Sequence, residues 1–120
     1  MMEQLGAEAG GRSKDRETIT IENVVAKSAI TFDAPQQALG RTVLAQYCAS
    51  ARSNHGFLIT VCEFPSVGQA VRGSAEVTAV RGKLSGWQSK QRKKSVLEVV
   101  ARSDAKKESV DAVLAAFDAL

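Results

Sequence analysis

The sequence predicts an α+β domain of two layers, in which an antiparallel sheet of about four strands carries two helices on one face. Three observations lead to this fold class. Runs rich in β-branched residues recur along the chain, the C-terminal segment has helical apolar spacing, and 120 residues with 44% apolar content suffice for a single core. The expected order is β-α-β-β-β-α, and the opposite face of the sheet is expected to be open to a partner.

Residues 1–16 combine glycine, alanine and alternating charges without periodicity, which predicts a disordered N-terminal leader. Residues 17–120 are expected to form the single α+β domain. No apolar run approaches the roughly 18 residues that a membrane span needs, and none resembles a signal peptide. We therefore expect an intracellular protein, cytoplasmic or nuclear, without a membrane partner.

Residues 17–32 are rich in β-branched side chains and predict the first strand. Ile19 and Ile21 alternate onto one face, and after Asn23 the phase shifts so that Val24 falls on the other face. A bulge or a functional side chain is therefore expected at Asn23.

Residues 33–54 predict the first helix, because Asp33 can cap it and Pro35 suits its first turn. Its buried stripe is expected to comprise Leu39, Val43 and Tyr47, which recur at intervals of four residues.

Three further strands are predicted at residues 56–64, 74–84 and 95–103, and the polar stretch between the last two reads as a hairpin loop. Residues 103–120 predict the second helix, with Ser103 as its cap. The apolar face of this helix consists of Val110, Val113, Leu114, Phe117 and Leu120.

Catalytic signals are missing from the sequence. There is no glycine-rich phosphate loop, no carboxylate pair at a telling spacing and no metal-ligand set, and the single histidine, His55, falls in a predicted turn. Cys48 and Cys62 are expected to be buried, reduced thiols. We therefore predict a protein that is not an enzyme and needs no cofactor.

Positive charge is concentrated in one segment, residues 81–94, which holds six of the 16 cations and none of the 13 acidic residues. Such a cluster attracts polyanions, although a solvated loop is the simpler interpretation. Trp87, the only tryptophan, lies within it and could stack on a base. The residues of this segment that we predict to bind nucleic acid are Arg81, Lys83, Trp87, Lys90, Arg92, Lys93 and Lys94.

Two segments are similar to parts of one repeat of the TATA-box-binding protein family. TITIENVVAKSAI, residues 18–30, resembles the first strand of the repeat, and VVARSDAKKESVDAVLAAF, residues 99–117, resembles its last strand and helix. The resemblance implies that Asn23 and Val25 face a DNA groove and that Phe57 stands for a wedge phenylalanine. In the last strand, valines occupy positions at which the family has threonine and glycine.

Two classes of function remain open. The first is a nucleic-acid-binding module, for which a role in transcription is one option. It would use the open sheet face and the basic loop around Trp87 to contact DNA or RNA. The alternative is a protein-interaction or assembly module, a small oligomeric α+β domain resembling ferredoxin-like regulatory trimers, that uses the sheet face or edge.

Overall fold

A computed structural model describes residues 16–38 and 44–120 of the chain. Residues 1–15 of the predicted leader lie outside the described residues, as do Leu39 and Val43 of the predicted helical stripe. The elements are, in chain order, helix α2 (Ile21–Ser28), strands β1 (Gln36–Gln37), β2 (Tyr47–Ser53) and β3 (Phe57–Glu63), helix α3 (Val67–Arg81), strands β4 (Trp87–Arg92) and β5 (Ser95–Ala101), and helix α4 (Lys107–Ala119).

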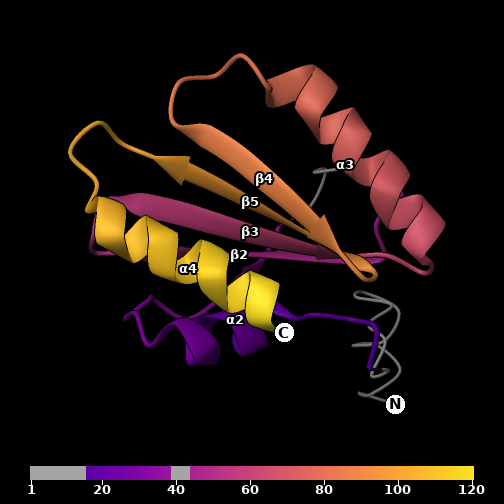
Figure 1. Ribbon diagram of the computed structural model, residues 1–120, viewed down its shortest axis with the longest axis horizontal. Coiled ribbons are helices and arrows are strands. Elements are labelled where there is room, and N and C mark those ends of the chain that lie inside the picture. The colour runs from indigo at the N-terminus through magenta and orange to yellow at the C-terminus, as the bar shows by residue number, and fades with distance from the viewer. Residues whose placement is uncertain (1–15, 39–43) are drawn as a thin grey trace.

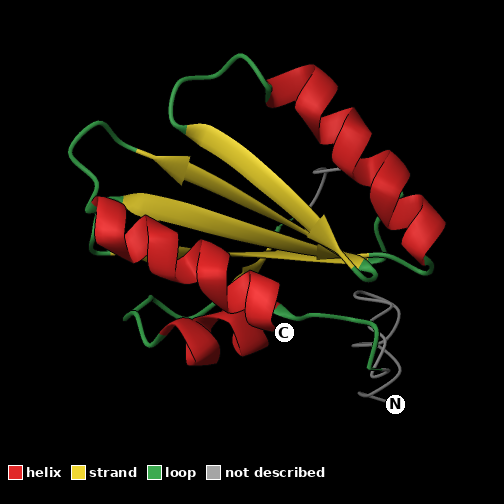
Figure 2. Cartoon of the chain, in the orientation of Figure 1, coloured by secondary structure: helices red, strands yellow, loops and turns green. Residues whose placement is uncertain are grey.

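The strands form one antiparallel sheet in the order β1-β2-β3-β5-β4. Figure 1 shows α2 and α4 side by side beneath this sheet, and α3 beyond its other side. Figure 2 shows the same arrangement as three layers, helix, sheet and helix. The α+β class is confirmed, but the described part of the chain has five strands and three helices, not four and two.

The larger core lies between the sheet and the pair α2 and α4. Its helical side chains are Ile21 and Val24 from α2, with Val110, Val113 and Phe117 from α4, all at most 5% exposed. Strands β2, β3 and β5 supply the other side of this core, with Ala49, Ala51, Ile59, Val61, Leu97 and Val99. Successive side chains of a strand point to opposite faces of the sheet. The strand residues that alternate with these core residues therefore point toward α3.

Three rows of side chains cross the α3 face of the sheet from β2 through β3 and β5 to β4, because residues paired across strands point to the same side. The inner row is Cys48, Cys62, Val96 and Gln91, the middle row is Ser50, Thr60, Glu98 and Ser89, and the outer row is Arg52, Leu58, Val100 and Trp87.

Helix α3 packs over the inner row and builds a second, smaller core. Ala70 and Val77 are buried there together with Phe64, which follows β3. Gly73 allows the close approach of the helix, since a Cβ at this position would lie 2.4 Å from the Phe64 ring. The expectation that both helices share one face, leaving the other free, is therefore wrong: α3 covers part of the second face.

The predicted first strand, residues 17–32, is also wrong, because its centre is helix α2. The Thr20 Oγ1 accepts a hydrogen bond from the Asn23 N–H at 3.1 Å, and the Asn23 Oδ1 accepts one from the Thr20 N–H at 3.2 Å. This reciprocal pair is a capping box, which starts a helix. Ile21, Val24 and Ser28 then follow helical spacing, so the cap and the spacing outweigh the β-branched composition.

The predicted helix at 33–54 is likewise replaced by strands β1 and β2 in the described residues. Tyr47–Ser53 pairs with Phe57–Glu63 along its whole length, and Gly56 turns the hairpin with a φ of 93°. Alanine favours a helix in isolation, but pairing with the apolar strand β3 outweighs that preference. Tyr47 does pack against the larger core, as predicted.

The predicted strand at 74–84 belongs to α3. The Ser66 Oγ accepts a hydrogen bond from the Gln69 N–H at 3.1 Å and caps this helix. The alternation of Val77 and Ala79 with Glu76 and Thr78 suggested a strand, but the Ser-x-x-Gln pattern marks a helix start. By contrast, the strands predicted at 56–64 and 95–103 are confirmed by β3 and β5.

The C-terminal helix is confirmed as α4, although it starts at Lys107 with Lys106 at the cap position, not Ser103. Of its predicted apolar face, Val113 and Phe117 are fully buried, while Leu114 and Leu120 are partly buried against the larger core.

Cys48 and Cys62 form a disulfide, so the prediction of two reduced thiols is wrong. The two residues are directly opposite in the pairing of β2 with β3, and both are buried. Because residues 33–54 were predicted to be helical, the sequence analysis placed Cys48 on an element that does not pair with β3. Disulfides persist in oxidising compartments, so this bond does not favour the predicted intracellular location.

Candidate functional site

The basic segment does not form the predicted hairpin loop, because residues 87–92 within it are strand β4 at one edge of the sheet. The Lys90 Nζ lies 2.6 Å from Asp118 Oδ2, and the Arg92 Nη1 donates a hydrogen bond of 3.3 Å to the Leu120 carbonyl oxygen. Both partners lie at the C-terminal end of α4, where cations stabilise the helix dipole. The two cations therefore hold α4 on the sheet.

Lys93 and Lys94 form the two-residue turn between β4 and β5, and Lys93 has a left-handed φ of 53°. The Lys94 N–H donates to the Glu17 carbonyl oxygen, and the Lys94 carbonyl oxygen accepts from the Phe64 N–H, both at 2.8 Å. Lys83 is exposed in the connection that follows α3. The six cations are thus spread over α3, the connection after it, the edge strand and its turn, and they do not form one finger.

Trp87 lies against the smaller core rather than in solvent. Its Nε1–H donates a 3.0 Å hydrogen bond to Oε1 of Glu98, a carboxylate in the middle row that is only 1% exposed. The Arg81 Nη1 lies 3.7 Å from the same oxygen. The indole and the guanidinium thus both contact one buried carboxylate, which joins the end of α3 to β4 and β5.

We predict that Trp87→Phe lowers the free energy of unfolding by about 1–3 kcal/mol, because the ring remains while the buried carboxylate loses a hydrogen-bond donor. Urea unfolding of the four proteins of a double-mutant cycle with Glu98→Gln measures this effect. In the Glu98→Gln background the loss should be clearly smaller. An equal loss in both backgrounds would show that the indole acts through packing alone.

Of the three remaining predicted site residues, Asn23 and Val25 lie on a helix, and Phe57 starts strand β3. Asn23 caps α2, and Val25 on the same helix packs against the larger core. Phe57 is 3% exposed, and its ring meets that of Phe32 edge to face, with the centroids 5.7 Å apart. The first strand implied by the resemblance to a TATA-box-binding repeat is therefore a helix in this chain.

The β2, β3 and β5 members of the outer row, Arg52, Leu58 and Val100, lie on the part of the α3 face that α3 leaves uncovered. Thr60 and Glu98 in the middle row are 2% and 1% exposed, whereas Val100 in the outer row is 38% exposed. Leu58 beside it is half-buried, and Arg52 is exposed. This end of the sheet therefore presents apolar side chains to solvent.

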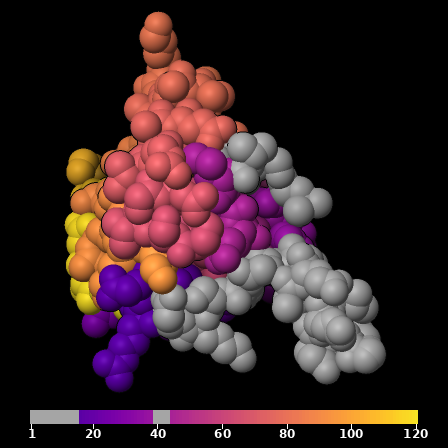
Figure 3. All heavy atoms as spheres, turned by 90° about the vertical axis from the view of Figure 1, so that its right-hand side faces the viewer, coloured from indigo at the N-terminus to yellow at the C-terminus, as the bar shows by residue number. Residues whose placement is uncertain are grey.

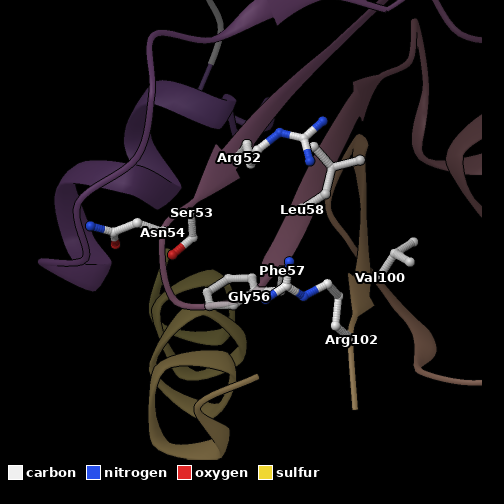
Figure 4. A pocket seen from close by; sticks show the side chains of 8 residues that line it. All are labelled: Arg52, Ser53, Asn54, Gly56, Phe57, Leu58, Val100 and Arg102. Carbon is white, nitrogen blue, oxygen red and sulfur yellow. The ribbon is translucent and has the colours of Figure 1, made fainter. Parts of the chain in front are cut away.

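Two arginines frame these apolar side chains. Strands β2 and β5 both run antiparallel to β3, so their last residues lie on either side of its start, which places Arg52 and Arg102 at the same end of the sheet. Figure 4 shows Leu58 between the two guanidinium groups and Val100 to one side of them. The groove there has a volume of about 410 Å³, and it is lined by Arg52, Ser53, Asn54, Gly56, Phe57, Leu58, Val100 and Arg102.

The two arginines differ in their partners. Across residues 16–38 and 44–120, no hydrogen bond or ion pair engages the Arg52 side chain. Arg102 makes two 3.0 Å hydrogen bonds to the carboxylate of Asp104. These bonds, and then the opposite charge, hold the pKa of Asp104 below its ordinary value of 3.8 and raise that of Arg102. The Arg102 and Asp104 side chains are 72% and 67% exposed, so water screens the ion pair. Another anion can therefore readily replace Asp104 at the Arg102 guanidinium.

A second hollow, of about 360 Å³, lies on the other side of Arg52. It shares Arg52 and Leu58 with the groove, but it also contains Asp33 and the edge strand β1. An anion at Arg52 is therefore better placed toward Arg102 than toward Asp33.

Of the residues that line the groove, only Phe57 was predicted from the sequence as a site residue. One signal was present: the triplet Ala-Arg-Ser occurs at residues 51–53 and again at 101–103, at the ends of the two strands that flank β3. Arg52 was assigned to a helix, which hid the equivalence of the two triplets.

The turn beside the groove is fixed by contacts with the start of α4. The His55 Nδ1 lies 2.6 Å from the Ser109 Oγ, and the His55 carbonyl oxygen accepts a hydrogen bond from the Lys106 N–H at 3.0 Å. The Gly56 carbonyl oxygen accepts from the Arg102 N–H at 2.9 Å. These bonds hold the end of the β2–β3 hairpin against the segment that carries Arg102.

A further exposed surface is the outer side of α3. Figure 3 shows this helix facing the viewer, with the connection after it projecting at the top. Four of the five large apolar side chains exposed in the described part of the chain lie on α3 or in the connection after it: Val67, Val71, Val80 and Leu84.

Among the described residues, no group of three or more His, Cys, Asp or Glu side chains could hold a metal ion. Within residues 16–38 and 44–120, no helix combines the length and the apolar character that crossing a bilayer requires.

Comparisons with known proteins gave no relative. No protein-family model matches the chain, and neither the curated proteins nor the solved structures contain a match. The comparisons therefore neither support nor oppose the resemblance to a TATA-box-binding repeat.

Proposed function

We propose that this protein is a non-enzymatic nucleic-acid-binding module that uses the groove at the uncovered end of the sheet. The observation that carries the proposal is the placement of Arg52 and Arg102 in one groove with the apolar side chains of Leu58 and Val100. Guanidinium groups bind phosphate oxygens in a bidentate manner, and the backbone of a nucleic acid presents such oxygens at every nucleotide.

The proposed surface differs from the one that the sequence analysis favoured. Lys90 and Arg92 contact the end of α4, and Trp87 contacts a buried carboxylate, so these side chains have structural roles that account for them. Arg52 is an exposed cation beside an apolar surface, and the fold requires neither its charge nor its exposure. Phe57 is the one originally predicted site residue that lines the groove.

We predict that Arg52→Gln weakens binding to nucleic acid and flattens its dependence on salt, by up to about 0.7–0.9 in the log–log slope for a lost phosphate contact. Fluorescence anisotropy with labelled DNA and RNA at two salt concentrations measures both quantities. Lys27→Gln is the matched control, because Lys27 is an exposed cation on α2, in the layer beyond the other face of the sheet.

The double variant Lys90→Gln/Arg92→Gln separates this proposal from a basic finger on β4. It should bind almost as well as the wild type, because those cations contact α4. If this variant loses the salt-dependent binding and Arg52→Gln keeps it, the groove is not the site.

A second candidate function is a protein-interaction module, and the exposed valines of α3 favour it. Val67 and Val71 are 45% and 50% exposed on successive turns of one helix, an arrangement typical of a contact surface. A mass that rises with protein concentration, together with no binding to any nucleic acid, would make this the better account.

A further inference from the structure

We infer that the groove binds single-stranded nucleic acid and discriminates against duplex nucleic acid. This inference rests on the proposed function and specifies the class of ligand. It follows from the apolar surface between the two arginines, which an interface with phosphates alone would not need.

The base of the groove consists of Leu58 and Val100, which are opposite each other on β3 and β5. Val100 is 38% exposed, so it gains from burial under a ligand with an apolar surface. The face of a nucleobase is such a surface. In a duplex the base faces are stacked on one another, and the backbone offers charged phosphates and sugars instead. Only an unpaired base can cover these two side chains.

The arginines complete the complementarity to a single strand. Arg52 lies on β2 opposite Leu58, and Arg102 follows Val100 by two residues at the end of β5, so phosphates on both sides of one base can reach a guanidinium group. Adjacent strands are about 4.8 Å apart, and β3 lies between β2 and β5, so the separation of the two strands is about 10 Å. This is a span of a few nucleotides at most, which limits the groove to a short site.

The acidic residues around the groove favour one course for the strand. Asp33 lines the hollow on the far side of Arg52, and Asp104 occupies the Arg102 guanidinium in the free protein. The backbone should therefore run from Arg52 across Val100 to Arg102, where a phosphate replaces Asp104. Along this path the phosphates contact both guanidinium groups and stay away from the Asp33 carboxylate.

The test compares a labelled ten-nucleotide oligothymidylate and oligouridylate with a DNA hairpin duplex of similar length, each titrated with the wild type and with Val100→Tyr. Tyrosine suits an exposed strand position, and its ring adds a stacking plane to the groove. We expect the wild type to prefer the single strands, and Val100→Tyr to bind them at least about fivefold more tightly while duplex binding is unchanged. Val100→Ser should weaken single-strand binding only.

The outcomes separate the two proposals. Equal affinity for single strands and duplex, with no effect of Val100→Tyr, would overturn this inference and leave the groove as a general phosphate site, since Arg52→Gln would still weaken binding. If neither single strands nor duplex bind at low salt, the proposed function itself fails, and this inference fails with it.

Discussion

The variant Val113→Asp should unfold the domain. Val113 is completely buried between α4 and the sheet, among apolar side chains from α2, β3 and β5. A carboxylate there is a buried charge in an apolar core, which costs several kcal/mol against a total stability of roughly 5–15 kcal/mol. Circular dichroism during thermal unfolding should show no cooperative transition for this variant.

Ala115→Asp is the matched control, because Ala115 lies on the same helix but faces solvent. This variant should retain a cooperative transition close to that of the wild type. Leu114→Asp should fall between the two, since Leu114 is only partly buried. If Val113→Asp melts like Ala115→Asp, α4 does not cover the sheet as described.

Reduction of the disulfide should produce the second large effect. Cys48 and Cys62 close a loop with a sequence separation of 14 residues, and constraining a loop of this size in the unfolded chain contributes about 3 kcal/mol. Urea unfolding with and without a phosphine reductant should therefore give midpoints that differ clearly.

The double variant Cys48→Ala/Cys62→Ala is the control for this measurement. Its stability should be lower than that of the oxidised wild type and insensitive to reductant. An oxidised wild type that is no more stable than its reduced form would mean that the bond does not stabilise the fold, and free-thiol titration of the unfolded protein would show whether it forms at all.

Local pattern was sufficient to predict the elements whose apolar spacing is strong. The segment around β3 is apolar on both faces, β5 is rich in valine, and α4 repeats apolar residues at helical intervals. These three elements also form most of the larger core, so the α+β class and the position of its C-terminal helix followed from the sequence.

The remaining elements depended on signals that composition hid. Helices α2 and α3 are rich in valine or other β-branched residues. The signals that mark them as helices are their caps, Thr20 with Asn23 and Ser66 with Gln69, and in α2 also the helical spacing of the buried residues. Strand β2 is rich in alanine, and it is a strand because it pairs with β3. That pairing is a tertiary effect, and it decides the positions of both Cys48 and Arg52.

The errors in secondary structure also displaced the candidate site. With residues 74–84 read as a strand, the cations that follow fell in a loop, where they were expected to be free for a ligand. In the structure α3 lies on the second face, and Trp87 and Arg81 contact the buried Glu98. The uncovered part of that face is therefore the end with Arg52 and Val100. No local pattern contains this information, because it depends on which part of the sheet α3 covers.

The most direct test of the proposed groove is a titration of one labelled oligothymidylate with the wild type, Arg52→Gln and Asp104→Asn, at two salt concentrations. The account predicts opposite effects. Arg52→Gln should bind more weakly with a shallower salt dependence, because a phosphate contact is lost. Asp104→Asn should bind more tightly, because the carboxylate that occupies the Arg102 guanidinium is gone. Salt-sensitive binding that neither variant changes, or no binding by the wild type at low salt, would contradict the account.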